Sequence, residues 1–144
     1  MNNTSPATFV SEMLRDLRAH IVLCEDVLSL LSRENQALAR TDYDTATFHE
    51  GRKDLIPRLN QSLNRIRHWR ESWQRLAAHD RACQSEVKQM FQTVQDLLVK
   101  ILLLDRENQQ ALLRRGLLPP REVPSFAGQQ PDYVASIYRR HTGS

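Results

Sequence analysis

The amino-acid sequence predicts an all-α fold, in which three long antiparallel helices form a coiled-coil-like helical hairpin bundle with a proline-containing C-terminal tail. The 144 residues include only 4 glycines and 6 prolines, and five of the prolines lie outside residues 7–118. The long middle is rich in Leu, Arg, Gln, Glu and Ala, which favour helices. Hydrophobic residues make up 40% of the chain and the mean hydropathy is −0.55. These values are typical of amphipathic helices that bury one stripe and expose the rest.

The distribution of charge and proline divides the chain into two parts. Residues 1–113 carry 15 Lys+Arg and 15 Asp+Glu, so the formal net charge of +3 arises in the last 31 residues. Four prolines between positions 119 and 131 prevent a continuous helix there. We therefore expect a three-helix bundle over residues 1–116 and a flexible tail over residues 117–144. In that tail a short amphipathic segment has an apolar face made of Tyr133, Val134, Ile137 and Tyr138.

The first helix is predicted to begin after Ser5, because serine is a favoured N-cap residue and Pro6 suits the first helical position. Its apolar residues recur every three or four positions for about four heptads, which is typical of a coiled coil. This stripe consists of Val10, Met13, Leu14, Leu17, Ile21, Cys24, Val27, Leu28, Leu31 and Leu38. The helix should end near Arg40, where Asp42 or Asp44 can cap the second helix.

The second and third helices show the same periodicity. The apolar face of the second consists of Phe48, Leu55, Leu59, Leu63, Ile66, Trp69, Trp73 and Leu76. Gly51 and Pro57 weaken its first half, so we expect either a kink or a separate short segment there. Asp80 is the expected N-cap of the third helix, which should end at Gly116. The third stripe consists of Val87, Met90, Phe91, Val94, Leu97, Leu98, Ile101, Leu104, Leu112 and Leu113.

A four-residue motif, Arg-Glu-Asn-Gln, occurs at residues 33–36 and again at residues 106–109, an offset of 73 residues. Short connections make consecutive helices antiparallel, so the first and third helices run parallel and both copies lie at the same end. The motif interrupts the apolar stripes with Glu34, Asn35 and Asn108. Such residues can form a buried polar layer that fixes helix register, or a surface that faces a partner. We interpret the first copy as structural and leave both interpretations open for the second.

The sequence contains none of the motifs that indicate catalysis, metals or cofactors. The Glu-x-x-His spacing of a di-iron bundle is absent, as are HExxH, CxxC, GxGxxG and the P-loop. His20 lies on the apolar stripe, which predicts a packed histidine rather than a ligand. Cys24 is similarly expected to be a small buried residue. We therefore expect no enzyme activity, no metal, no cofactor and no small-molecule substrate.

Cysteine usage and hydropathy indicate a location. Cys24 and Cys83 are too few for a disulfide scaffold and predict a reduced, cytoplasmic chain. The longest aliphatic run, residues 101–104, is far shorter than the roughly 18 residues of a membrane span. The first nine residues lack the basic and apolar regions of a signal peptide. We expect a protein that is not inserted in a membrane.

Residues 64–75 alternate basic residues with aromatic ones, a pattern that also occurs in nucleic-acid-binding proteins. Ile66, Trp69 and Trp73, however, share one helical face, and that face continues the buried stripe. Acidic residues in the first helix and in the turns offset the positive charge. We therefore favour core tryptophans beside a solvated arginine face over a nucleic-acid platform.

In residues 30–63, a leucine-rich helix ends in a glutamate and a leucine, an acidic turn follows, and a lysine before a Leu-Ile pair opens the next helix. The residues concerned are Glu34, Leu38, Asp42 or Asp44, Lys53, Leu55 and Ile56. In this pattern the region resembles the flagellar export chaperones of the FlgN type. The outline of the chain, three long helices followed by a C-terminal segment, is also similar to that family.

The resemblance implies a non-catalytic, cytosolic chaperone of flagellar type III secretion. Such proteins bind the C-terminal helical region of hook–filament junction proteins, prevent their premature assembly and deliver them to the export gate. The resemblance places the partner-binding surface at the end of the third helix and beyond, on Asn108, Leu112, Leu113, Leu117 and Leu118. It also implies that Tyr133 or Tyr138, in the segment with Val134 and Ile137, contacts the gate protein.

Two other functions fit the same residues. A structural coiled-coil adaptor would use the long helices to build a homo-oligomer or a bundle with another protein. A helical nucleic-acid-binding protein would use the arginines of the second helix, and we rank this function below the adaptor.

Overall fold

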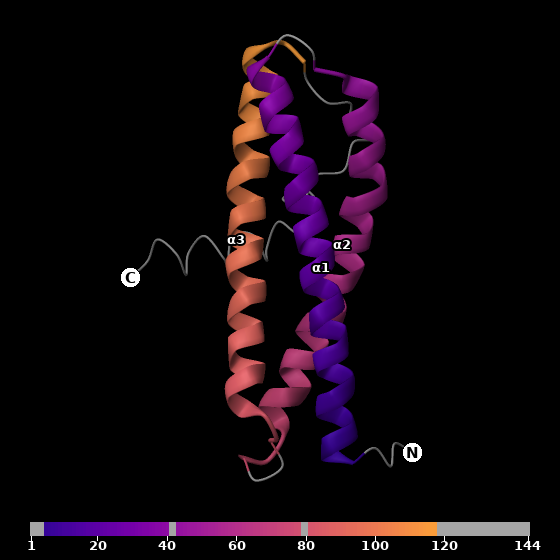
Figure 1. Ribbon diagram of the computed structural model, residues 1–144, viewed down its shortest axis with the longest axis vertical. Coiled ribbons are helices and arrows are strands. Elements are labelled where there is room, and N and C mark those ends of the chain that lie inside the picture. Colours follow the sequence, from indigo (N-terminus) through magenta and orange to yellow (C-terminus); the bar gives the residue numbers. More distant parts are fainter. Residues whose placement is uncertain (1–4, 41–42, 79–80, 118–144) are drawn as a thin grey trace, which may run out of the picture.

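The computed structural model describes residues 5–40, 43–78 and 81–117, and it confirms the all-α class (Figure 1). The helices are α1 (Pro6–Ala39), α2 (Thr45–Arg75) and α3 (Gln84–Arg114). Consecutive helices run in opposite directions, so that α1 and α3 are parallel and their C-terminal ends meet (Figure 1). No strand occurs among the described residues, and none of their helices is both long and apolar enough to cross a bilayer.

Two of the predicted helix starts are confirmed. The Ser5 side chain accepts a hydrogen bond from the Thr8 backbone N–H at 3.2 Å, and Pro6 is the first residue of α1. At the start of α2, Asp44 accepts from the backbone N–H groups of Ala46 and Thr47 at 3.1 and 3.4 Å. The Thr47 hydroxyl also donates to this carboxylate, and these bonds lower the pKa of Asp44. Both caps satisfy amide groups that have no partner inside the helix.

The start of α3 differs from the prediction. Cys83, not Asp80, is the N-cap residue, and its side chain makes no capping hydrogen bond. Its backbone adopts the left-handed region with φ of 55°, which is unusual for any residue with a Cβ atom. The chain therefore enters α3 by a backbone turn rather than by the side-chain cap that the aspartate suggested.

The role of Gly116 as the residue that terminates α3 is confirmed, with the last helical residue at Arg114 and the C-cap at Arg115. Gly116 has φ of 69°, and its N–H donates to the Leu113 carbonyl at 3.1 Å. The Leu117 N–H donates to the Leu112 carbonyl at 2.8 Å. These two bonds form a Schellman motif, in which glycine is favoured because the left-handed conformation clashes with a side chain.

Helix α2 is continuous through Gly51 and Pro57, so the separate short segment considered from the sequence does not form. The missing N–H of Pro57 is tolerated because the residues around it, Ile56 and Leu59, are fully buried. Gly51 has a packing role, since a Cβ atom there would lie 2.8 Å from Cδ1 of Leu30. The small residue lets α2 approach α1 closely at this level.

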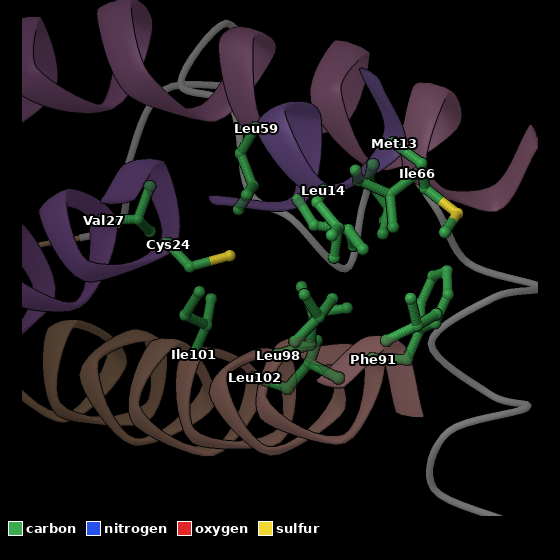
Figure 2. Packing of buried hydrophobic residues seen from close by; sticks show 14 of the residues in the cluster. Met13, Leu14, Cys24, Val27, Leu59, Ile66, Phe91, Leu98, Ile101 and Leu102 are labelled. Carbon is green, nitrogen blue, oxygen red and sulfur yellow. The ribbon is translucent and has the colours of Figure 1, made fainter. Parts of the chain in front are cut away.

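The hydrophobic core runs along α1, which packs against both α2 and α3. Figure 2 shows buried side chains from the three helices, among them Cys24 of α1, Leu59 of α2 and Leu98 of α3, pointing into the core between them. The fully buried members contributed by all three helices include Met13, Leu17, Val27, Leu31, Ile56, Leu59, Leu98 and Ile101. Burying each such side chain contributes about 1.5–3 kcal/mol, so this seam is the main source of stability.

The two tryptophans of α2 are part of this packing. Trp69 packs against the core, its indole N–H donates to Asp16 Oδ2 at 2.7 Å, and Phe9 meets its ring edge-on at 5.2 Å. Trp73 also packs against the core, with the Arg81 guanidinium 5.7 Å from its ring centre. The aromatic residues of the basic stretch thus serve the fold, as their shared helical face predicts.

Candidate functional site

The two copies of the Arg-Glu-Asn-Gln motif contact each other at the end of the bundle where α1 and α3 finish. Asn35 Nδ2 donates to Asn108 Oδ1 at 2.9 Å, which joins the equivalent asparagines of the two copies. Asn108 Nδ2 in turn donates to the Leu31 carbonyl at 2.9 Å and to Glu34 Oε1 at 3.0 Å. Asn108 and Glu34 are both 0% exposed. The buried polar layer is therefore present, and it includes the second copy as well as the first.

Arg52 of α2 completes this layer, which we call the polar end layer and define as Glu34, Asn35, Arg52, Asp105 and Asn108. Arg52 Nε and Nη2 donate to the two oxygens of Glu34 at 3.0 and 2.6 Å. Nη2 also donates to Asp105 Oδ1 at 2.8 Å. The three side chains are at most 4% exposed. One guanidinium thus links all three helices.

The electrostatics of the polar end layer favour a permanently charged Arg52. Burial by itself would lower the pKa of Arg52, but the hydrogen bonds and charges of Glu34 and Asp105 outweigh burial and raise the pKa above its usual value. The bidentate pairing with Glu34 is the strong geometry for a guanidinium and a carboxylate. The group thus holds two carboxyl side chains around one guanidinium.

Two further side chains close this end of the molecule. The Tyr43 hydroxyl donates to Glu34 Oε2 at 3.4 Å, and burial together with the Glu34 charge raises the pKa of Tyr43 to about 12. Arg115, just after α3, donates from Nη1 to the Leu38 carbonyl at 3.0 Å. The last turn of α1 is therefore tied to the end of α3.

Sequence reasoning identified Glu34, Asn35 and Asn108 but missed Arg52 and Asp105. A signal for both was present. Arg52 lies four residues after Phe48 and three before Leu55, and Asp105 lies four after Ile101. Each therefore occupies a stripe position, at the same end as the repeated motif. Opposite charges on facing stripes could have indicated a buried pair.

His20 is a packed histidine, as predicted. It is 0% exposed, its Nδ1 lies 2.7 Å from Ser62 Oγ, and its Nε2 lies 3.5 Å from Cys24 Sγ. Burial, aided by the charge of Arg65, lowers the pKa of His20 to about 4. Burial, aided by Glu25, raises the pKa of Cys24 to about 12. No group of three or more potential metal ligands occurs in the described part of the chain.

The predicted partner-binding residues fall into three groups. Asn108 and Leu112 are 0% and 3% exposed, and so lie inside the structure. Leu113 and Leu117 are 58% and 36% exposed and face solvent. The remaining predicted residues, Leu118, Tyr133, Val134, Ile137 and Tyr138, lie outside the described residues.

Exposed apolar side chains concentrate on the C-terminal half of α3 and just beyond it. Of the four exposed large hydrophobic residues in the described ranges, three are Leu103, Leu113 and Leu117, and the fourth is Val22 of α1. Leu103 and Leu113 are ten positions apart, which places them about 80° from each other around the helix. We call Leu103, Leu113 and Leu117 the apolar edge. It is the surface in this part of the molecule that a protein partner could cover.

Comparison with known proteins identifies no relative of this chain. No protein-family model, no curated protein and no solved structure matches the chain.

Proposed function

We propose that this protein is a non-catalytic export chaperone of the FlgN type, which binds the C-terminal helical region of hook–filament junction proteins in the cytosol. It would keep these subunits from assembling early and would deliver them to the flagellar type III export gate. The observation that carries the proposal is the apolar edge, since Leu113 and Leu117 belong to the segment that the resemblance implies for partner binding.

The apolar edge has the chemistry that an amphipathic partner helix requires. Such a helix binds by placing its apolar face on a complementary hydrophobic surface. Leu103 and Leu113 are 53% and 58% exposed, so covering them would remove substantial apolar area from water. Each leucine that becomes fully buried contributes roughly 1.5–3 kcal/mol. Two or three such contacts suit a complex that must later release its cargo.

The polar end layer supports the proposal by fixing the orientation of α3. Asn108 is bonded to α1, and Leu113 follows it by five residues, which places Leu113 about 140° away around the helix. The hydrogen bonds of Asn108 therefore keep Leu113 turned outward. A surface held in its binding conformation loses less entropy on binding than a flexible one.

Binding to the C-terminal helical region of junction proteins tests the proposal. Isothermal titration calorimetry with the full-length chain should give a saturable, roughly stoichiometric complex with one of these proteins. The double substitution Leu103→Glu/Leu113→Glu should weaken binding by at least about tenfold, because it places two charges in the interface.

The matched control is Val22→Glu, which changes the fourth exposed large hydrophobic residue of the described ranges and lies on α1. It should bind like the parent chain, and all variants should keep the parent melting temperature. Absence of binding to every junction protein tested, or full affinity in the double variant, would refute the proposal.

The apolar edge also favours one alternative, a coiled-coil adaptor in which two copies of this chain pack through α3. Light scattering on the parent chain and on Leu103→Glu/Leu113→Glu distinguishes the two functions. A dimer that becomes a monomer in the double variant supports the adaptor. A parent chain that is monomeric at high concentration refutes it.

A further inference from the structure

A surface pocket of about 360 Å³ lies between α1 and α2, on residues that the proposed function does not use. From α1 it is lined by Val22, Leu23 and Asp26, and from α2 by Arg58, Ser62 and Arg65. The pocket is thus bounded by both apolar and charged side chains. None of these residues belongs to the polar end layer or to the apolar edge.

Ser62 lines the pocket, and its side chain belongs to a hydrogen-bonded chain that leads through His20 to the buried Cys24. With a pKa of about 12 the Cys24 thiol keeps its proton, and with a pKa of about 4 the His20 ring is neutral. An imidazole nitrogen accepts more readily than a thiol sulfur, which favours the tautomer in which His20 Nε2 accepts from Cys24 across 3.5 Å. In the tautomer with the ring proton on Nδ1, His20 donates to Ser62 Oγ across 2.7 Å. In this tautomer the Ser62 hydroxyl proton is left to donate to a molecule in the pocket.

The charges at the rim favour an anion. Arg58 and Arg65 are seven residues apart, about two helical turns, and flank Ser62 from either side. Arg65 forms no ion pair with any described residue. Arg58 is paired with Asp54 at 3.1 Å, but both side chains are more than half exposed, so this pair is weak. Asp26 is the one carboxylate in the lining, against two guanidinium groups.

Apart from Asp26, the wall on α1 is apolar. Val22 is 58% exposed. Ala19 and Leu23 line the pocket beside it. An exposed valine opposite two arginines and a serine suits a ligand that has a short aliphatic body next to its negative charge. A purely inorganic anion would leave this wall uncovered.

We infer that this pocket binds an aliphatic carboxylate, with its carboxylate at Arg65 and Ser62 and its apolar body against Val22. Two sources share this chemistry: a free branched-chain acid, and the C-terminus of a peptide that ends in leucine or valine. The guanidinium would hold the carboxylate through charge-assisted hydrogen bonds, and the Ser62 hydroxyl would add a third donor.

The test is an NMR titration of the isotopically labelled full-length chain with three probes. N-acetyl-leucine represents a peptide C-terminus, 4-methylpentanoate represents a free acid, and N-acetyl-leucinamide lacks the charge. At least one carboxylate should cause saturable shifts centred on the amides of Val22 and Ser62. The amide should bind at least about tenfold more weakly, because it loses the charge-assisted bonds.

Substitutions locate the carboxylate. Arg65→Gln should weaken binding by about tenfold and Ser62→Ala by about threefold, whereas Arg75→Gln, an exposed arginine at the end of α2, should leave affinity unchanged. Melting temperatures show that each variant is folded. Tighter binding of N-acetyl-leucine identifies a peptide C-terminus as the ligand, and tighter binding of 4-methylpentanoate identifies a free acid. The inference is overturned by the lack of saturable shifts with both carboxylates, by equal binding of the amide, or by full affinity in Arg65→Gln.

Discussion

Arg52 is buried together with its charge, which is an expensive arrangement unless the partners are well placed. Removing a guanidinium from water costs several kcal/mol, and the attraction of Glu34 and Asp105 offsets much of this cost. Replacing such a group with apolar residues can leave a protein equally stable, so the value of the charges is mainly in specificity. Here, Arg52 selects the one register in which Glu34 of α1 and Asp105 of α3 lie side by side.

Replacing Arg52 alone should therefore be costly. In Arg52→Met, two buried carboxylates would lose their cation, and we expect the free energy of unfolding to fall by about 3–5 kcal/mol. Urea denaturation followed by circular dichroism measures this change. The matched control, Arg58→Met, breaks an exposed pair with Asp54 and should cost no more than about 0.5 kcal/mol. Equal stabilities for the two variants would contradict the role of Arg52.

His20 should make stability depend on pH. Its pKa is lowered from 6.5 to about 4 in the folded chain, so the unfolded chain binds a proton more readily between these values. The stability that neutral His20 contributes is complete above pH 6.5 and is lost as the pH falls toward 4. Between pH 7.5 and pH 5 this loss amounts to about 2 kcal/mol.

Urea denaturation at both pH values tests the effect of His20. The His20→Gln variant keeps a hydrogen-bonding group near Ser62 but cannot titrate, so its stability should fall by about 2 kcal/mol less than that of the parent over this range. His68→Gln, at an exposed position, should retain the parent pH dependence. If the free energy of unfolding of His20→Gln falls with pH as steeply as that of the parent, the pH dependence comes from other groups.

At the level of single residues, the sequence predicted what local periodicity can show. Glu34, Asn35 and Asn108 were recognisable because each interrupts an apolar stripe. Arg52 and Asp105 were not recognised, because their burial depends on partners 18 and 53 residues away in the chain. A charge on a stripe position predicts burial only when the position of the opposite charge is also known.

Among the elements, some helix ends could be predicted from the sequence and others could not. Ser5, Asp44 and Gly116 act through neighbours within a few residues, and all three were predicted. The start of α3 was not, because Cys83 adopts a left-handed backbone without the side-chain bond that usually marks a cap. The sequence left open whether α2 would kink or be interrupted at Pro57, and the helix is continuous there; helix propensity alone could not decide this, because packing against α1 also contributes.

The backbone of Cys83 gives a prediction for α3. Cys83→Gly removes the Cβ atom that opposes a φ of 55°, and should raise the free energy of unfolding by about 0.5–1 kcal/mol. Cys83→Ala keeps the Cβ atom and should stay within about 0.3 kcal/mol of the parent, because Cys83 is exposed and makes no capping bond. Thermal unfolding of the three proteins compares them, and a glycine variant less stable than the alanine variant would argue against strain at this position.

In the whole molecule, α1 is the central helix because both other helices pack on it. The sequence predicted three amphipathic helices and their directions from stripe lengths and short connections. It did not predict that α1 would take the central position, since each stripe alone is compatible with several arrangements. That arrangement depends on which apolar stripes pack together into one core, as those containing Leu31 of α1 and Leu98 of α3 do.

The central position of α1 predicts the order of local opening. Buried side chains occur along almost all of α1, whereas those of α2 lie only between Arg52 and Ile66. Hydrogen–deuterium exchange should therefore be slowest in the middle of α1 and fastest in the first turns and last turns of α2. Mass spectrometry of peptic fragments would resolve these regions. Equal protection of α1 and the ends of α2 would contradict a central α1.

The parallel arrangement of α1 and α3 has an electrostatic consequence at the end where Arg115 donates to the Leu38 carbonyl. Two helix C-termini meet there, and each carries a partial charge of about −0.5 from its aligned peptide dipoles. Arg115 offsets part of this potential at the end of α1. A helix lying along Leu103, Leu113 and Leu117 would be favoured when its own positive N-terminal end points to the same side. The apolar edge therefore has a preferred direction for a bound helix, which would run antiparallel to α3.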